Sequence, residues 1–329
     1  MVSAWTVVEA ICLVCVFIGA LSGNMALFLI VAKVRTLQTK GNVFILNLAA
    51  ADLMVSLVNL PITIVTVIAE DWILGNTVCL ISGFITLLTF VASCMALSMI
   101  SINRYHAIVH WTTYESTYTR RKCALYVFIT WTITIMLSLP PFFGWASFEY
   151  DHGQSYCFAE WRVSKSYTIF MIAACLMGPL TVMSYCYIKI IRYHRESERD
   201  VIRASMTTTA STSTTFRITP DFERRPSKKR LTKTIVTLIV VFGICWSPFA
   251  LIMIVQVFSS AYVPRAVDFG SLVLGYLNSF FNVIVYNVTN KKIRKEFRNL
   301  FYSVLLSKTK DSVDRSRSCS MSASTGNYI

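Results

Sequence analysis

One carboxylate lies in the middle of a long apolar run, in the segment LNLAAADLMV. This residue, Asp52, is the only acid deep in any such run. An ionisable side chain in an apolar phase is costly, so its presence indicates a function. With the neutral polar residues Ser93, Asn278 and Asn282 of other runs, Asp52 could offer oxygen ligands to a sodium ion. Alternatively, Asp52 is protonated and only forms hydrogen bonds with polar neighbours such as these or Asn24.

Another apolar run ends in the segment ALSMISINRYHAIVH, which contains Asn103-Arg104-Tyr105. Arg104 either marks the point where a helix leaves an apolar phase or has a task at that boundary. A third run contains Trp246-Ser247-Pro248 near its middle. A proline there kinks a helix, which gives either two arrangements that a ligand can bias or only a static bend.

The elements that carry these residues follow from the composition. Of the 329 residues, 55% are hydrophobic and 15% are charged, whereas a soluble domain has about 25% charged residues. Seven apolar runs are long enough for membrane-spanning helices, each of which needs about 20 residues. The predicted fold class is an all-α membrane protein, a bundle of seven transmembrane helices. The expected spans cover residues 7–32, 42–68, 77–107, 122–144, 166–191, 231–258 and 267–288.

Basic residues gather in the connections on one side of this bundle. With the N-terminus outside, all but three of the 31 Lys and Arg residues lie on the inner side. Positive charge favours the cytoplasmic side of a membrane. We therefore predict a multi-pass protein of the plasma membrane with an extracellular N-terminus and a cytoplasmic C-terminus. The net charge of +14 is attributed to these connections, which favour anionic membrane lipid, and no nucleic-acid partner is expected.

Two cysteines fall on the predicted outer side. Cys79 opens the third span, and Cys157 lies in the connection between the fourth and fifth spans. Disulfides persist on the oxidising side of a membrane, so a bridge between them is favoured over two free thiols. Such a bridge would hold the connection over the top of the third helix.

Two inner segments have the composition of chains without a packed core. Residues 195–230 are rich in Thr, Ser and basic residues, and residues 301–329 are similar. We predict a mobile third intracellular loop and a disordered cytoplasmic tail. Both could be phosphorylated beside their basic residues, or they could be only solvated basic segments.

Taken in order along the chain, these features resemble the rhodopsin-like (class A) G-protein-coupled receptors over about residues 8–300. One motif occurs in nearly every span: Gly23-Asn24, LAAAD ending at Asp52, Cys79 with Arg104, Trp131, Pro179 with Tyr187, FGICWSP from Phe242 to Pro248, and Asn282 with Tyr286. The run KKIRKEFRNL resembles the short amphipathic eighth helix of that class, which lies on the inner membrane face. The receptor domain would then cover residues 1–300.

Two departures from the class pattern refine this resemblance. The usual acidic residue before the arginine is Asn103, and the usual Asn-Pro-x-x-Tyr is Asn282-Val283-Ile284-Val285-Tyr286. Melatonin receptors are similar in both respects. The segments KGNVFILNLAAADL and SINRYHAIVH also look like that branch, so the chain resembles it most.

The resemblance implies a mechanism of coupling. A ligand would favour an outward swing of the sixth helix around Pro248, which opens an inner cavity for a heterotrimeric G protein. Arg104, Tyr187 and Tyr286 would line that cavity, with Asn103 and Tyr105 beside them. A sodium ion would favour the inactive arrangement. Because Asn103 is neutral, we expect weak restraint of the arginine and measurable basal activity. Arrestin and receptor kinases would act on the Ser/Thr-rich segments.

The expected ligand is small and largely apolar, in a pocket between spans three, five, six and seven. By resemblance, the candidate ligand-binding residues are Thr86, Phe90, Trp246 and Tyr276, and ordinary helix packing is the alternative for each. Thr86 stands where amine receptors have an aspartate, and no lysine occurs between Lys233 and Lys291 for covalent retinal. A melatonin-like ligand stays possible, although Pro141 and Cys175 replace an asparagine and a histidine of that branch.

Three other functions compete with that of a coupled receptor. A transporter or channel needs a path of charged residues, and Asp52 is the only such residue inside the spans. An enzyme needs paired catalytic groups, and the four histidines lack metal-binding spacing, so no enzymatic activity is expected. A decoy receptor, which binds ligand without coupling, remains a more serious alternative because two motifs are altered.

Overall fold

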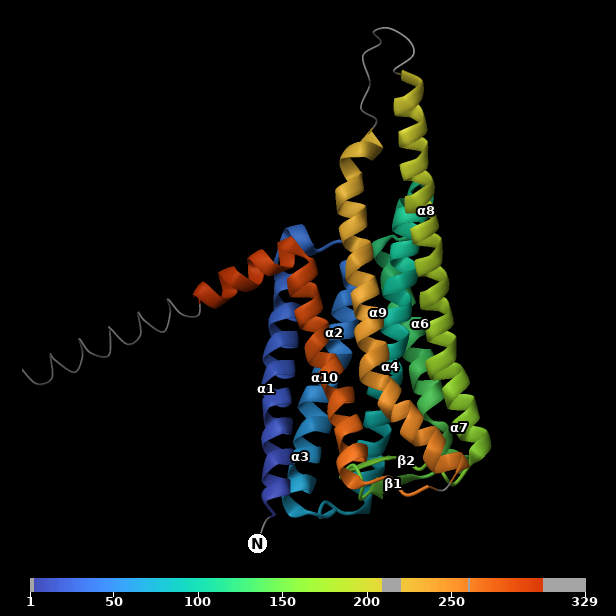
Figure 1. Cartoon of the computed structure of the whole chain (residues 1–329). Coiled ribbons are helices and arrows are strands. Elements are labelled where there is room, and N and C mark those ends of the chain that lie inside the picture. The colour runs from blue at the N-terminus through green and yellow to red at the C-terminus, as the bar shows by residue number, and fades with distance from the viewer. Residues whose placement is uncertain (1–2, 209–219, 260, 304–329) are drawn as a thin grey trace, which may run out of the picture.

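The computed structural model describes residues 3–208, 220–259 and 261–303, and seven of its helical segments are long and apolar enough to span a membrane. They stand side by side as one bundle (Figure 1). In chain order the spans are α1 (Ala4–Lys33), α2 to α3 (Asn42–Met54 and Leu60–Ala69), α4 (Asn76–Val109), α6 (Arg120–Ser138) with a turn at Pro140–Phe143, α7 to α8 (Lys165–Met171 and Gly178–Thr208), α9 (Pro220–Phe258) and α10 (Arg265–Thr289). The short helix α5 (Trp111–Thr117) lies between α4 and α6. The predicted seven-helix fold is thereby confirmed.

The span ends agree with the sequence to within a few residues at most places, and the largest differences lie in the predicted third loop. There α8 continues to Thr208 and α9 begins at Pro220, so both helices extend into the segment 195–230. Residues 209–219, and the tail from residue 304, lie outside the described residues. The mobility of the loop and the disorder of the tail stay predictions.

Two spans contain a widened π-helical turn, at Val55–Asn59 and at Ile172–Met177. Each turn is followed by a proline, Pro61 or Pro179. A proline ring clashes with the carbonyl four residues earlier, so an extra residue in the preceding turn relieves the clash. Widened turns of this kind are frequent at functional sites.

A two-stranded hairpin closes one end of the bundle, which we call the hairpin end (Figure 1). Strands β1 (Phe148–Asp151) and β2 (Tyr156–Ala159) pair antiparallel, with Phe148 opposite Ala159. All four residues of β2 are buried. The sequence did not indicate these strands. The predicted disulfide between Cys79 and Cys157 is present, with 5.4 Å between the Cα atoms, and it joins β2 to the start of α4.

The interior consists of two apolar clusters, one toward each end of the bundle. The first contains the hairpin residues Tyr156 and Phe158, and the second contains Tyr286 and Tyr118. Phe90 and Trp246 pack against both clusters. These two side chains therefore connect the two halves of the interior.

A further helix covers residues 291–303 and turns away from the bundle at the end opposite the hairpin (Figure 1). The Asn290 side chain caps it, since its Oδ1 accepts hydrogen bonds from the backbone N–H groups of Lys292 and Ile293. Ile293 is fully buried, and Phe297 and Leu300 pack against the second cluster. One apolar face and exposed basic residues make this helix amphipathic, as predicted for an eighth helix.

Candidate functional site

The buried acid Asp52 is held by α10. Its Oδ1 accepts a hydrogen bond from Ser279 Oγ at 2.8 Å, and its Oδ2 accepts one from Asn282 Nδ2 at 3.0 Å. Asn24 reaches the same region from α1, where its Nδ2 donates to the backbone oxygen of Ser279 at 3.0 Å. Asp52 is fully buried. The carboxylate therefore joins the second span to α10, and α1 is bonded to the same part of α10. The sequence had missed Ser279 as a member.

Two other residues of the predicted sodium set lie beside this cluster. Ser93 and Asn278 are both buried, and both line a cavity that also reaches Ser279. The Oδ1 atoms of Asn278 and Asn282 are buried and have no hydrogen-bond partner among the described residues. Carboxylate and carboxamide oxygens are the kind of ligands that hard cations take, and the sodium site stays a prediction.

This cavity lies between the hairpin and the Asp52 cluster. All four candidate ligand-binding residues, Thr86, Phe90, Trp246 and Tyr276, line it. A more apolar cavity adjoins it and shares Phe90, Trp246 and Phe249. The spans and the sequence-predicted residues thus converge on one internal space.

Other lining residues were absent from the sequence prediction, which placed the pocket among spans three, five, six and seven. The second span contributes Val55 and Asn59, and the hairpin contributes Tyr156 and Phe158. Asn59 is only a neutral amide next to an apolar segment in the sequence. The one signal that could have indicated it is Pro61, which predicts a distorted turn just before it.

Aromatic rings form the floor of the cavity, and aromatic rings of the hairpin, which we call the lid, cover it. Phe90 and Trp246 have ring centroids 4.6 Å apart, and Trp246 and Phe249 meet edge to face at 5.8 Å. From the lid, Phe158 meets Phe249 at 6.0 Å. Trp246 precedes Pro248 in α9, and α9 changes direction in the half nearer the hairpin (Figure 1). A ligand in this cavity would contact the bent segment of α9 directly.

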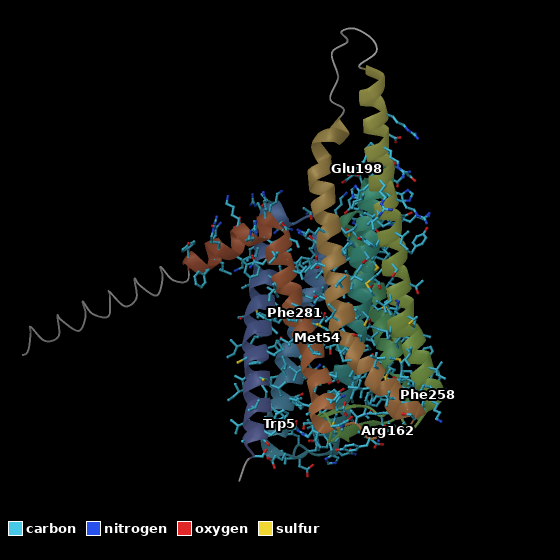
Figure 2. All side chains as sticks on the ribbon, in the orientation of Figure 1. Trp5, Met54, Arg162, Glu198, Phe258 and Phe281 are labelled. Carbon is cyan, nitrogen blue, oxygen red and sulfur yellow. A yellow bond between two sulfur atoms is a disulfide. The ribbon has the colours of Figure 1, made fainter. Side chains whose placement is uncertain are left out.

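Charged side chains connect the lid to the surrounding helices through hydrogen bonds and an ion pair. Arg265 of α10 donates to Glu9 Oε2 of α1 at 2.9 Å, to Ser155 Oγ at 2.8 Å and to the backbone oxygen of His152. Asp268 accepts from Gln154 of the hairpin and from Gln256 of α9, the latter at 3.1 Å. Figure 2 shows Trp5, Arg162 and Phe258 at this end of the bundle, and Met54 and Phe281 nearer its middle.

The N-terminal end of α1 is tied to the second span at the same end. Thr6 Oγ1 donates to Glu70 Oε1 at 2.7 Å, and the backbone N–H of Ser3 also contacts this oxygen. The hydrogen bond from Thr6 is the main reason that the pKa of Glu70 lies below its ordinary value. Glu70 itself is exposed.

Arg104 lies at the opposite end, which we call the Arg104 end. No carboxylate of the described residues is within ion-pairing distance of its guanidinium. Asn103 Nδ2 donates to Tyr114 Oη of α5 at 3.2 Å, and Tyr105 Oη contacts His110 Nε2 at 2.9 Å. The Arg104 side chain lines an open hollow of about 810 Å³ with Lys291, Lys292 and residues of the first connection.

Two other predicted coupling residues do not line that hollow in this arrangement. Tyr286 is buried, and its hydroxyl has no partner among the described residues. Tyr187 is half-buried on α8. Their part in coupling stays a prediction.

The model of the rhodopsin family of 7 transmembrane receptors matches residues 23–286. The chain belongs to this family. Receptor relatives include the melatonin receptor type 1C of Xenopus laevis, which is 30% identical over 90% of this chain and 68% of its own length. The GQ-coupled rhodopsin of Mizuhopecten yessoensis is 30% identical over 88% of this chain and 58% of its own length.

Among solved structures, squid rhodopsin superposes on the receptor with a TM-score of 0.81. That match covers 92% of this chain and 87% of squid rhodopsin at 23% identity, so it supports the fold alone. The predicted class A membership and the resemblance to melatonin receptors are confirmed. The receptor is a multi-pass membrane protein, and its relatives are receptors and not enzymes.

Proposed function

We propose that the receptor binds a small, largely apolar extracellular ligand and activates a heterotrimeric G protein through outward movement of α9. The N-terminus and hairpin would face the outside of the plasma membrane, and the Arg104 end would face the cytoplasm. The observation that supports this most is the internal cavity, because all four candidate residues line it and Trp246 connects it to both core clusters.

The proposed movement begins at Trp246. A ligand that displaces the Trp246 ring changes its packing on Phe90 and Phe249, and α9 is already bent in this half. Since both core clusters include contacts with this ring, the change reaches Tyr286 and the Arg104 end. Arg104 lacks a carboxylate partner among the described residues, which fits a weakly restrained resting state with basal activity.

A sodium ion is proposed as an allosteric ligand of the Asp52 cluster, beside the ligand cavity. Asp52 would supply the charge, and Ser93, Asn278 and Asn282 would supply further oxygens. A bound ion would oppose the active arrangement by holding α10 against the second span. Arrestin and receptor kinases are proposed partners of the Ser/Thr-rich segments. No covalently bound cofactor is proposed.

The test is guanine-nucleotide exchange on purified G proteins by the receptor in lipid nanodiscs, with a ligand screen that includes indoleamines. Wild type should show basal exchange and a ligand response, and Arg104→Ala should lose both while keeping ligand binding. Ligand binding without exchange on any G-protein subtype would instead indicate a decoy receptor.

A further inference from the structure

Three threonine hydroxyls in and beside the ligand cavity donate hydrogen bonds to backbone oxygens. Thr86 Oγ1 donates to Ser82 O at 2.8 Å, and Thr89 Oγ1 donates to Thr86 O at 3.0 Å. Thr63 Oγ1 donates to Asn59 O at 2.9 Å. A hydroxyl has a single proton, so each of these groups can then act only as an acceptor.

The direction of the Thr89 hydroxyl proton bears on the orientation of the Asn59 carboxamide. Asn59 lies 2.9 Å from Thr89 Oγ1. With the Thr89 proton on the Thr86 oxygen, Thr89 Oγ1 accepts from the amide nitrogen of Asn59, which is the orientation in the structure. The Oδ1 atom of Asn59 is therefore turned away from Thr89. It is buried and has no partner among the described residues, and Asn59 lines the cavity.

The same reasoning applies to Tyr276. Its hydroxyl lies 3.0 Å from Thr63 Oγ1, and either oxygen could be the donor by distance alone. With the Thr63 proton on the backbone oxygen, Tyr276 donates to Thr63. The Tyr276 oxygen keeps its free lone pairs and no free proton.

The cavity lining mixes hydrogen-bond acceptors with donors. Asn59 Oδ1 is a buried acceptor without a partner among the described residues, whereas Trp246 Nε1 and the hydroxyls of Ser93 and Tyr156 can donate. No ionised side chain lines this cavity or the apolar one beside it. A charged ligand would lose its hydration without a counter-charge, so the ligand should be neutral.

We propose that the cavity selects a neutral ligand that carries an N–H or O–H donor, and that Asn59 Oδ1 is the acceptor for it. The inference rests on the proposed function, because it assigns the ligand class of the same cavity. A buried acceptor without a partner is costly, and a donor on the ligand removes that cost. Asn59 closes the widened turn Val55–Asn59, a feature that is frequent at functional sites.

The test compares two probes that differ in one proton, β-naphthol and its methyl ether. Each is titrated into purified receptor in nanodiscs, and dissociation constants are taken from the shift in melting temperature. Wild type should bind β-naphthol about fivefold more tightly than the ether, which corresponds to one hydrogen bond. Asn59→Leu should abolish that preference. Equal binding of both probes to wild type, or no binding of either, overturns the proposal.

A second variant tests the orientation without touching the acceptor. Thr89→Val removes the partner of the Asn59 nitrogen, so the amide is free to turn and present its N–H to an ether oxygen. The ether should then gain affinity and the preference should fall. Thr130→Val is the matched control, because Thr130 bonds only to Tyr126 O in α6 and does not line the cavity. An unchanged preference in Thr89→Val would show that the assignment is wrong.

Because these titrations contain no G protein, the two proposals can fail separately. Probe discrimination by wild type without any nucleotide exchange would leave the ligand class in place and reject coupling. Exchange that responds to ligands, together with equal binding of the two probes, would keep the receptor function and reject the role of Asn59.

Discussion

At the hairpin end, one arginine and one disulfide join the lid to three helices, whereas at the Arg104 end the equivalent arginine has no ionic partner among the described residues. Arg265 contacts α1 and the hairpin connection, and Cys157 joins β2 to α4. Arg104 lies in an open hollow, and its neighbour Asn103 makes only a neutral hydrogen bond. At the hairpin end, the elements are therefore connected to one another by a disulfide and polar contacts, and the Arg104 end is left free to rearrange.

The largest effect is expected from removing the disulfide of the hairpin end. The double substitution Cys79→Ser and Cys157→Ser should lower the free energy of unfolding by about 4 kcal/mol, because the bridge closes a long loop. The measurement is the melting temperature of purified receptor. An unchanged melting temperature would mean that the hairpin end does not depend on its covalent link.

Next in size is Arg265→Ala, which leaves Glu9 buried without its cation. Glu9 is 3% exposed and Arg265 is 40% exposed. The loss should be about 2 kcal/mol, less than for a fully buried pair, because water screens the arginine. Adding Glu9→Gln to Arg265→Ala should restore part of the melting temperature. If the double variant is no more stable than the single one, the unpaired charge is not the cause.

At the Arg104 end, Asn103→Asp should add the restraint that the sequence lacks. Asn103 Oδ1 and Arg104 Nη1 lie 2.9 and 3.1 Å from the position that a Cβ on Gly41 would occupy, so a carboxylate at 103 is near the guanidinium. Basal nucleotide exchange should fall about fivefold, the effect of roughly 1 kcal/mol of charge pairing. Asn103→Ala, which adds no charge, should not reduce exchange. Equal exchange by Asn103→Asp and wild type would contradict weak restraint.

A smaller effect is expected from Gly41→Ala. The new methyl group would approach both Asn103 and Arg104 closely enough to displace them. Basal exchange should rise about twofold, within the range of a small steric change. The control is Gly270→Ala at the hairpin end, where an added Cβ meets nothing within 4 Å. A rise of the same size in the control would show that the effect is not specific to position 41.

The smallest effect is a pH dependence at the hairpin end. The pKa of Glu70 is lowered, chiefly by the hydrogen bond from Thr6. A group with a depressed pKa contributes its stability above its ordinary pKa and loses it as the pH falls through the folded value. The melting temperature of wild type should exceed that of Glu70→Gln slightly at neutral pH. This difference should shrink as the pH falls below the ordinary value of 4.5 and vanish below the lowered pKa of the folded receptor.

Much of this molecule could be predicted from its sequence, because lipid imposes long apolar helices and places basic residues between them. Asp52 was found by its type and its place in an apolar run, whereas the roles of Arg104 and Trp246 came from the resemblance to the receptor family. Ser279 and Asn59 were missed, since a neutral polar residue carries little signal until the rotation of its helix is known. The hairpin was missed because its short strands depend on the disulfide and on the helices that they cover. The preference for hydrogen-bond donors depends on where each hydroxyl proton goes, which only atomic positions reveal.

The widened turn at Val55–Asn59 has a consequence for how this chain tolerates insertions and deletions. Successive residues of a regular α-helix are rotated by about 100° around its axis. Deleting one residue from the turn would give an uninterrupted helix in which either Asp52 or Asn59 keeps its direction, but not both. The widened turn therefore sets the angle around the helix axis between Asp52 and Asn59. A single-codon deletion there would turn one of these side chains away from its site, although both residues would still be present.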